Sequence, residues 1–291
     1  MKKADAQVYH CAFNIAFFLP FQIMMIHPQF DPVAFSIGPV SVRWYGLAYL
    51  AGFALFFLLG RLRTKETWRG MEPEGLDDLL FFGMIGVILG GRLGFCLFYQ
   101  PEWFLSHPID ILKIWQGGMS AHGGMLGGVV AIALFSRKKR MNFLRVADFV
   151  VPLIPLGLFF GRIGNFINGE LWGRIADETL PWAMIFPQSG TFYPRHPSQL
   201  YEAVLEGICL FALVWMYSKR PRKEGNVAAL FCIGYAVARF AVEFFREPDA
   251  YLGLGLFGLS RGQWLTIPVF ALGLILFCRS ANAGNDTRQN R

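Results

Sequence analysis

The sequence predicts an all-α, polytopic membrane protein with about seven transmembrane helices. Of its 291 residues, 54% are hydrophobic and only 16% are charged, whereas a soluble domain carries nearer a quarter charged residues. The apolar residues come in blocks long enough to cross a bilayer, which takes roughly 20 residues in a helix. Short basic runs separate these blocks, a pattern typical of cytoplasmic loops. We therefore expect one membrane domain and no soluble module.

The apolar blocks define the expected helices in chain order. The expected spans are residues 44–60, 79–99, 119–136, 148–166, 200–217, 227–245 and 263–278. The first, third, fifth and seventh are each followed by Arg or Lys. Because cytoplasmic loops carry an excess of these residues, the pattern predicts that the N-terminus lies outside and the C-terminus in the cytoplasm.

Residues 1–24 are expected to lie outside the membrane domain. Met1-Lys2-Lys3 followed by an apolar run is similar to a signal peptide, but no small-residue cleavage site follows. Two alternatives remain, an interfacial segment or the product of a start codon upstream of the true one. We expect residues 25–280 to form the membrane domain and residues 281–291 a polar cytoplasmic tail.

The net charge of +7 raises the question of nucleic-acid binding. The basic residues occur in runs between apolar blocks, within residues 61–69, 137–140 and 219–223. Such runs beside membrane helices attract anionic lipid headgroups. We therefore expect the lipid bilayer as a partner, and no nucleic acid.

The five cysteines lie in apolar surroundings, and none belongs to a C-x-x-C pair. They are expected to be small buried hydrophobic residues, and not disulfides or zinc ligands. The H-E-x-x-H zinc motif, the P-loop and the G-x-S-x-G elbow do not occur in the sequence. The sequence thus predicts neither a metal nor a cofactor.

Polar side chains from five expected spans fall at similar depth. A charge near the bilayer centre costs on the order of 3 kcal/mol, so each such residue needs a physical reason. Arg92, Arg162 and Arg239 lie roughly 18–21 Å above the inner ends of their spans, in a hydrocarbon core about 30 Å thick. Tyr45 and His122 lie near the outer ends of theirs. We predict one cavity in the outer half of the membrane, lined by all of these residues.

The sixth span carries charges on one face. Arg239, Glu243 and Arg246 follow i, i+4, i+7 spacing, which places them on the same side of a helix. An internal salt bridge explains the spacing, and so does an anion site in which Glu243 holds Arg239. The excess of positive charge favours the anion site. In the fifth span, Glu202 and Glu206 at i, i+4 are expected to find partners among the arginines.

The third span begins with a histidine followed by a glycine repeat. Gly123 and Gly127 are four residues apart, as are Gly124 and Gly128, and small residues at this spacing let two helices approach closely. Packing explains the glycines but not His122. Two hypotheses remain for it, a helix-end histidine with a structural partner or a catalytic base.

The end of the fourth span holds the most informative motif. A helix cap explains Asn168 and Gly169 but not Arg162. Arg162 and Asn165 are i, i+3 neighbours, and a guanidinium beside an amide suits a phosphate. A structural arginine would need a carboxylate to neutralise it, and the nearest in sequence, Glu170, lies beyond the helix end, which favours a phosphate-binding role for Arg162.

On this motif the chain resembles the prolipoprotein diacylglyceryl transferases. Residues Gly161–Gly173 match the signature G-R-x-G-N-F-x-N-x-E-x-x-G at every fixed position. The resemblance covers about residues 25–280, and one departure is Arg43, where the family often has His. Other stretches similar to family sequence, in family order, are Phe30–Pro39, Trp44-Tyr45-Gly46, Gly90–Gly94, Gly117–Gly124, Arg195–Glu202 and Gly234–Asp249.

The resemblance implies a seven-span enzyme of the bacterial inner membrane with its active site toward the outer half. Such an enzyme transfers the diacylglyceryl group of phosphatidylglycerol to the lipobox cysteine of a preprolipoprotein, forming a thioether and releasing glycerol phosphate. The implied partners are phosphatidylglycerol, preprolipoprotein lipobox peptides and the bilayer. Carried over to this sequence, the implied phosphatidylglycerol-binding residues are Arg162, Asn165 and Glu170, and the implied catalytic residues are His122, Arg239, Tyr45 and Glu243.

The reaction suits these residue types. A free cysteine is only a few per cent thiolate near neutral pH, so a base such as His122 and the field of Arg162 and Arg239 would help to form the nucleophile. The same arginines would stabilise the departing phosphate. The phosphodiester supplies its own leaving group, so the reaction requires no metal.

Two other classes of membrane protein fit the sequence less well. A transporter or channel predicts polar residues along the whole depth of the membrane, whereas here they cluster in the outer half. An intramembrane protease needs a Ser/His dyad at matched depth or a pair of aspartates. Asp148 is the single aspartate within an expected span, and it lies at the inner end.

Overall fold

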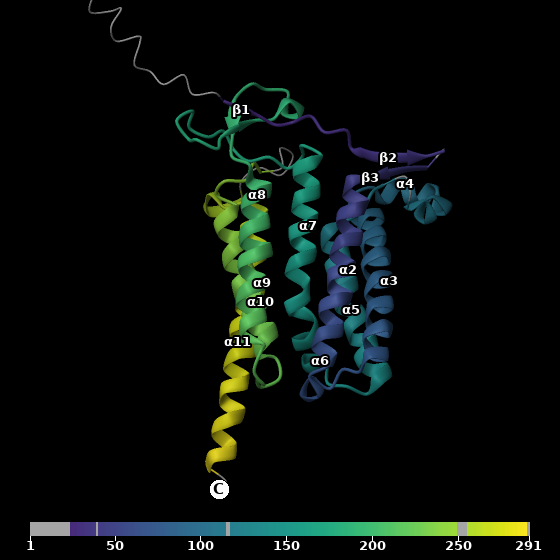
Figure 1. Ribbon diagram of the computed structural model, residues 1–291, viewed down its shortest axis with the longest axis vertical. Helices are drawn as coiled ribbons and strands as arrows, with labels where there is room; N and C mark the ends of the chain where they lie inside the picture. The colour runs from purple at the N-terminus through teal and green to yellow at the C-terminus, as the bar shows by residue number, and fades with distance from the viewer. Residues whose placement is uncertain (1–23, 39, 115–116, 249–254, 290–291) are drawn as a thin grey trace, which may run out of the picture.

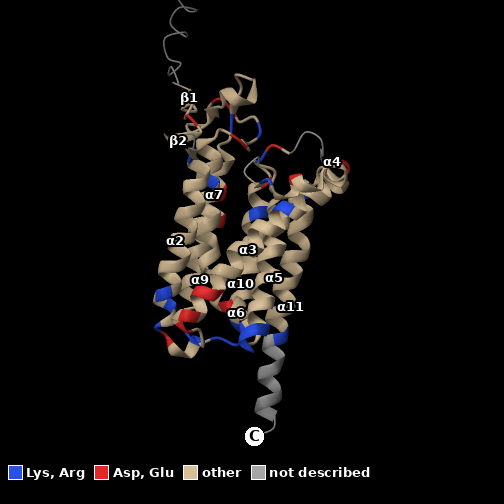
Figure 2. Ribbon diagram, turned by 90° about the vertical axis from the view of Figure 1, so that its right-hand side faces the viewer, with Lys and Arg blue, Asp and Glu red and all other residues tan. Residues whose placement is uncertain are grey.

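Long helices running roughly along one axis make up most of the molecule (Figure 1). The computed structural model describes residues 24–38, 40–114, 117–248 and 255–289. Short strands and loops cover one end of the bundle, which we call the strand end; the opposite end is the tail end. Helix α2 (Trp44–Thr64) begins at the strand end and ends at the tail end. Charged residues gather toward the two ends, with largely uncharged ribbon between them (Figure 2).

Helices occupy each of the seven ranges that the sequence predicts. After α2 they are α3 (Pro73–Phe98), α5 (Ala121–Lys139), the consecutive α6 (Phe143–Val150), η4 (Val151–Leu153) and α7 (Ile154–Ile167), the consecutive α8 (Ser198–Glu202), η6 (Ala203–Cys209) and α9 (Leu210–Tyr217), α10 (Asn226–Val242) and α11 (Arg261–Gln289).

Several of these segments are suited to a bilayer. Within the described part of the chain, five are long and apolar enough to cross a membrane: Trp44–Thr64, Pro73–Phe98, Phe143–Ile167, Ser198–Tyr217 and Arg261–Arg279. Helix α10 is apolar but shorter. The chain is therefore a mostly helical, multi-pass membrane protein.

Two small sheets at the strand end were missed by the all-α prediction. Strands β2 (Val33–Ile37) and β3 (Val40–Arg43) pair antiparallel. Strand β1 (Met25–Ile26) pairs in parallel with β4 (Met184–Ile185), which pairs antiparallel with β5 (Pro194–Arg195). At two to five residues each, these strands are too short for an alternating pattern to reveal. The remaining short helical elements are η1 (Thr67–Arg69), α4 (Pro101–Ser106), η2 (Pro108–Leu112), η5 (Pro187–Ser189) and η7 (Leu256–Gly258).

The described cysteines are free thiols, as expected, but two of them are exposed. Cys96 is buried, whereas Cys209 and Cys278 lie on the surface of the bundle. The prediction that they are buried is therefore wrong for these two. An apolar helix that faces lipid has no need to turn its small apolar residues inward. Cys11 lies outside the described residues.

Glycines bring α3 and α5 into direct backbone contact. A Cβ atom built at Gly86 would lie 2.5 Å from the carbonyl oxygen of Gly127, and one at Gly90 would lie 2.8 Å from the Cα atom of Gly127. A Cβ at Gly94 would lie 2.9 Å from the Cα atom of Gly123. The predicted role of the glycine repeat in close helix packing is confirmed, because no side chain fits between these backbones.

We expect Gly127→Ala to destabilise the protein by about 1–3 kcal/mol, since overpacking must push α3 and α5 apart. The same substitution at an unconstrained helical site stabilises by up to about 1 kcal/mol. The matched control is Gly128→Ala, where the new Cβ meets only a Val87 methyl carbon at 3.8 Å. Thermal unfolding in detergent measures both variants. Equal melting temperatures for the two would contradict the packing argument.

Candidate active site

Three arginines and three glutamates meet near the strand end of the bundle. Glu202 and Glu206 are almost fully buried, with 1% and 0% of their surface exposed. The members come from α7, the α8–η6 segment, α10 and the turn after α10. We call this set the buried charge network, and it consists of Arg162, Glu202, Glu206, Arg239, Glu243 and Arg246. Its formal charges balance when all six groups are ionised.

Arg162 is neutralised by residues far from it in sequence. Its Nε atom forms an ion pair with Glu202, and its Nη2 atom lies 3.8 Å from an Oε2 atom of Glu206. The argument that Arg162 lacks a well-placed carboxylate is therefore wrong, because Glu202 and Glu206 supply two from another helix. Its side chain keeps 19% of its surface exposed.

Arg239 is the centre of the network. Its Nη1 atom lies 3.0 Å from Glu202 Oε2 and donates to Glu206 Oε1 at 3.4 Å, while its Nη2 atom donates to Glu243. The predicted i, i+4 pair within α10 is confirmed, and so is the expectation that Glu202 and Glu206 find arginine partners. Arg246 lies at the edge, 3.9 Å from both Glu202 and Glu243.

A π-helical segment carries one of the buried glutamates. Glu202 ends α8, and Glu206 lies in η6 (Ala203–Cys209), where the helix widens to the π form. Such segments are rare and occur most often at functional sites. Here the π turn lets Glu206 contact both Arg162 and Arg239, which come from different helices.

Glu243 is held from the opposite side by the start of α11. The Ser260 hydroxyl donates to Glu243 Oε2 at 2.5 Å. Ser260 also forms a capping box with Gln263, in which the Gln263 N–H donates to Ser260 Oγ at 3.1 Å and the Ser260 N–H donates to Gln263 Oε1 at 2.9 Å. A Cβ at Gly262 would collide with the Glu243 carboxylate. Sequence analysis missed Ser260 and Gly262, although S-x-x-Q before an apolar run is a helix-start signal.

The end of α7 connects Arg162 to two further predicted residues. Arg162 Nη1 donates to Asn165 Oδ1 at 3.3 Å, and Asn165 Nδ2 donates to Glu170 Oε1 at 2.8 Å. Asn168 is the C-cap of α7, and Gly169 follows with φ +63°, as the cap prediction requires. Gln199 Nε2 donates to the Glu170 carbonyl oxygen at 2.6 Å, which fixes the turn against α8.

Tyr45 packs directly on this part of α7. A Cβ at Gly164 would lie 2.8 Å from the Tyr45 ring, so the glycine of the signature leaves room for the tyrosine. The ring also lies edge-on to Tyr49, with centroids 5.2 Å apart. Tyr45 thus lies against the helix that carries Arg162.

The structure does not link Arg92 or His122 to the buried charge network. Arg92 donates to backbone carbonyl oxygens at the strand end, among them Asp110 at 2.5 Å and Ile111 at 2.9 Å. Its charge therefore anchors the loop before α5, which explains it without a ligand. His122 is exposed at the start of α5. The described residues form no hydrogen bond or ion pair that joins either side chain to the network.

The loops over the site are tied to it by backbone bonds. The Gly173 N–H donates to the His196 carbonyl oxygen at 2.8 Å, and the Arg174 N–H donates to the Phe245 carbonyl oxygen at 2.8 Å. The His196 ring lies 3.1 Å from the Tyr201 hydroxyl. Partial burial lowers the pKa of His196 below its ordinary value, so this imidazole is neutral at pH 7 and adds no charge beside the network.

In the described ranges, no group of three or more His, Cys, Asp or Glu side chains is arranged to hold a metal ion. The glutamates of the site face guanidinium groups instead.

Together, fold and site define a multi-pass membrane protein with a buried arginine–glutamate network. The family model for prolipoprotein diacylglyceryl transferase matches residues 32–279. The chain belongs to this family.

Several relatives are similar over nearly their whole length, and all three described next are named phosphatidylglycerol–prolipoprotein diacylglyceryl transferase. The protein from Bordetella avium is 56% identical over 259 residues, which cover 89% of this chain and 97% of the relative. That from Dechloromonas aromatica is 56% identical over 257 residues, 87% and 96% of the two chains. That from Nitrosomonas europaea is 58% identical over 255 residues, 87% and 91% of the two chains.

We expect Glu202→Gln to lower stability strongly, by about 3–5 kcal/mol, because it leaves Arg162 and Arg239 short of a buried counter-charge. Thermal unfolding in detergent measures the change, and Glu178→Gln on the exposed loop is the control. In a double-mutant cycle with Arg162→Gln, the two effects should be strongly non-additive. Additivity within about 0.5 kcal/mol would show that the ion pair does not couple them.

Proposed function

We propose that this protein transfers the diacylglyceryl group of phosphatidylglycerol to the thiol of the lipobox cysteine in preprolipoproteins. The observation that carries the proposal is the position of Arg162. It lies in the family signature, donates to Asn165, which in turn donates to Glu170, and remains partly exposed within the buried charge network. In the reaction a sulfur–carbon bond forms, a carbon–oxygen bond to phosphate breaks, and glycerol phosphate leaves with the electron pair.

In the proposed site, Arg162, Asn165 and Glu170 bind the phosphatidylglycerol headgroup. The guanidinium offers paired N–H donors to two phosphate oxygens. Glu170 accepts from the Asn165 amide, which holds that amide in place beside Arg162. The headgroup is thus recognised by groups that are oriented before the lipid arrives.

Arg239, Glu243, Tyr45 and His122 are the proposed catalytic residues. Arg239 is 9% exposed, so its charge acts through a medium with little water and stabilises the negative charge that grows on the leaving phosphate. Glu243 fixes its orientation. Tyr45 lies beside the same end of α7, and His122 is the proposed base that takes the proton of the thiol.

We also propose seven membrane spans, with α5 and α10 crossing alongside the five longer segments. The N-terminus then lies outside, the C-terminus lies in the cytoplasm, and the buried charge network lies in the outer half of the bacterial inner membrane. Residues 25–280 form the membrane domain, residues 281–291 a cytoplasmic tail, and residues 1–24 an extension that is not needed for transfer. The basic runs at the tail end support this orientation.

Transfer of a radiolabelled diacylglyceryl group from phosphatidylglycerol to a lipobox peptide by purified protein tests the proposal directly. The matched control is a peptide with serine in place of the lipobox cysteine, which should receive no label. Label appearing equally on the serine peptide would contradict thioether formation.

We expect Arg162→Lys to lose most transfer activity, by at least about tenfold, and Arg162→Ala to lose about a hundredfold or more. A lysine keeps the charge but lacks the planar fork that a phosphate accepts. Because the phosphate is bound both before and during the reaction, phosphatidylglycerol binding should weaken as well as turnover. If Arg162→Ala kept wild-type lipid affinity and wild-type transfer activity, the assignment would be wrong, and Arg239 would become the leading candidate for the phosphate ligand.

We expect His122→Gln to lose about a hundredfold or more in transfer while the protein stays folded, since general bases contribute about 10²–10⁴-fold. Glutamine keeps a hydrogen-bonding group but cannot take a proton near pH 7. The exposed position of His122 predicts little change in melting temperature. Near-normal turnover would instead leave thiolate formation to the arginine field and the solvent.

A further inference from the structure

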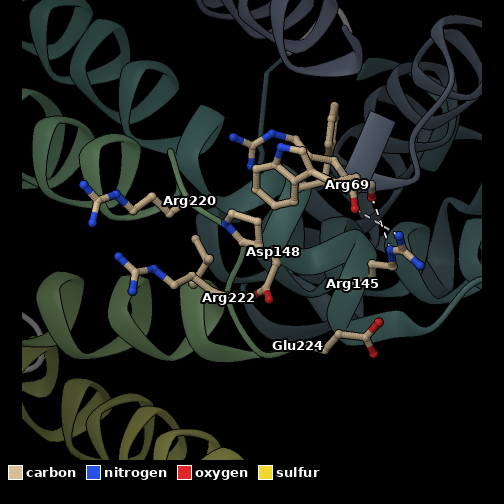
Figure 3. Close-up of a pocket in the computed structure, with 10 residues that line it drawn as sticks. Arg69, Arg145, Asp148, Arg220, Arg222 and Glu224 are labelled. Atoms are coloured by element: carbon tan, nitrogen blue, oxygen red, sulfur yellow. Dashed lines mark hydrogen bonds between the residues drawn. The ribbon is translucent and has the colours of Figure 1, made fainter. Parts of the chain in front are cut away.

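A second charged cluster lies at the tail end of the bundle, away from the buried charge network. A cavity of about 280 Å³ is enclosed there by the loop after α2, by α6 and by the loop between α9 and α10 (Figure 3). Its charged lining residues are Arg69, Arg145, Arg220, Arg222, Asp148 and Glu224. Four arginines from three separate segments thus surround one small cavity.

Two of these arginines are fixed parts of the wall. Arg69 is buried, pairs with Glu66 at 2.6 Å and donates to the Ser218 carbonyl oxygen at 2.8 Å. Its guanidinium also lies over the Trp68 ring, 4.1 Å from the centroid. Arg145 donates to the carbonyl oxygens of Trp68 at 3.1 Å and Arg69 at 3.3 Å. The back of the cavity is therefore rigid and positively charged.

Asp148 contributes less negative charge to the cavity than its position suggests. Its two carboxylate oxygens accept from the Gly225 N–H at 2.7 Å and the Ala228 N–H at 2.8 Å. These are backbone groups at the start of α10, whose helix dipole partly offsets the carboxylate charge. Asp148 thus caps the N-terminus of α10 with both carboxylate oxygens, and it forms no ion pair with the cavity arginines.

The other two arginines present unused donors. Arg222 uses its Nε atom to donate to the Tyr217 carbonyl oxygen at 3.0 Å, and its guanidinium stacks on the Tyr217 ring. Its two terminal nitrogens stay available. Arg220 is exposed and forms no hydrogen bond or ion pair with any residue that the structure describes. Arg220 and Arg222 therefore form no ion pair within the described residues, and with Arg69 and Arg145 they outnumber the two lining carboxylates, Asp148 and Glu224.

The cavity also lies beside the ends of segments that are suited to cross a membrane. Three segments suited to cross a membrane have an end beside it: α2 ends at Thr64, Phe143–Ile167 begins at Phe143, and Ser198–Tyr217 ends at Tyr217. Trp68, part of the lining, is of the residue type that membrane interfaces favour. A cavity of this size suits a headgroup whose acyl chains remain in the bilayer.

We propose that this cavity binds the phosphate group of an anionic glycerophospholipid from the leaflet at the tail end. Arg220 and Arg222 contact the phosphate oxygens through their free N–H groups, and Arg69 and Arg145 supply the positive field behind them. The bound lipid ties the α2–α3 loop, α6 and the α9–α10 loop together. The site is separate from the buried charge network and does not take part in transfer.

The test measures retention of dioleoyl phosphatidic acid by the purified protein in neutral detergent, using native mass spectrometry across a lipid titration. Arg220→Ala/Arg222→Ala should bind one lipid roughly thirtyfold more weakly, because each basic residue near an anionic lipid contributes about a factor of five. The matched control is Arg137→Ala/Lys138→Ala, which removes the same charge at the same end but outside the cavity. Transfer at saturating phosphatidylglycerol should be unchanged in both.

Two results would overturn the proposal. One is equal lipid retention by wild type and Arg220→Ala/Arg222→Ala, or an equal loss in the control pair, which would mean that general surface charge attracts the lipid. The other comes from a parallel titration with inorganic phosphate. Thermal stabilisation of wild type by phosphate, lost in Arg220→Ala/Arg222→Ala and without lipid retention, would identify a soluble phosphate as the occupant.

Discussion

The buried charge network is the constraint on which the strand end of the bundle depends. A single charge near the bilayer centre costs on the order of 3 kcal/mol. The free-energy cost of burying six ionisable groups from separate segments would be prohibitive unless they formed ion pairs with one another. Glu202 satisfies both Arg162 and Arg239, so α7, α8 and α10 must pack at fixed depth. Ser260 extends the same requirement to the start of α11 through Glu243.

Charge balance also shapes what the network can do. Arg239 is surrounded by three carboxylates, so its position hardly changes when a ligand binds. Arg162 is more exposed, and its partners are Glu202, Glu206 and Asn165. In the proposed reaction, a phosphate bound at Arg162 would add negative charge to a cluster whose formal charges already balance, which would favour release of the charged product once the ester bond breaks.

Local patterns in the sequence predicted the parts of this structure that local geometry fixes. The pair of Arg239 and Glu243 follows from helical spacing, and the contact of Gly127 with α3 follows from the glycine repeat. The i, i+4 spacing of Glu202 and Glu206 correctly indicated that these residues find partners among the arginines. Agreement in depth failed for Arg92, because depth does not say which way a side chain points, and backbone carbonyl oxygens accept the hydrogen bonds of its guanidinium instead. The contact between Arg162 and Glu202 joins residues 40 positions apart, and no spacing rule reports it.

The two ends of the bundle use arginine in opposite ways, and their surroundings explain the difference. In the apolar interior an unpaired guanidinium is unstable, so Arg162 and Arg239 form ion pairs with glutamates. An anionic ligand would have to share these arginines with the glutamates. At the tail end Arg220 and Arg222 are exposed and pair with no carboxylate among the described residues, because the solvent stabilises their charge. Binding at the proposed interior site would therefore be selective, because a ligand must fit donors that are already oriented. Binding at the proposed tail-end site would depend mainly on charge, since phosphate would reach it without displacing a carboxylate from Arg220 or Arg222.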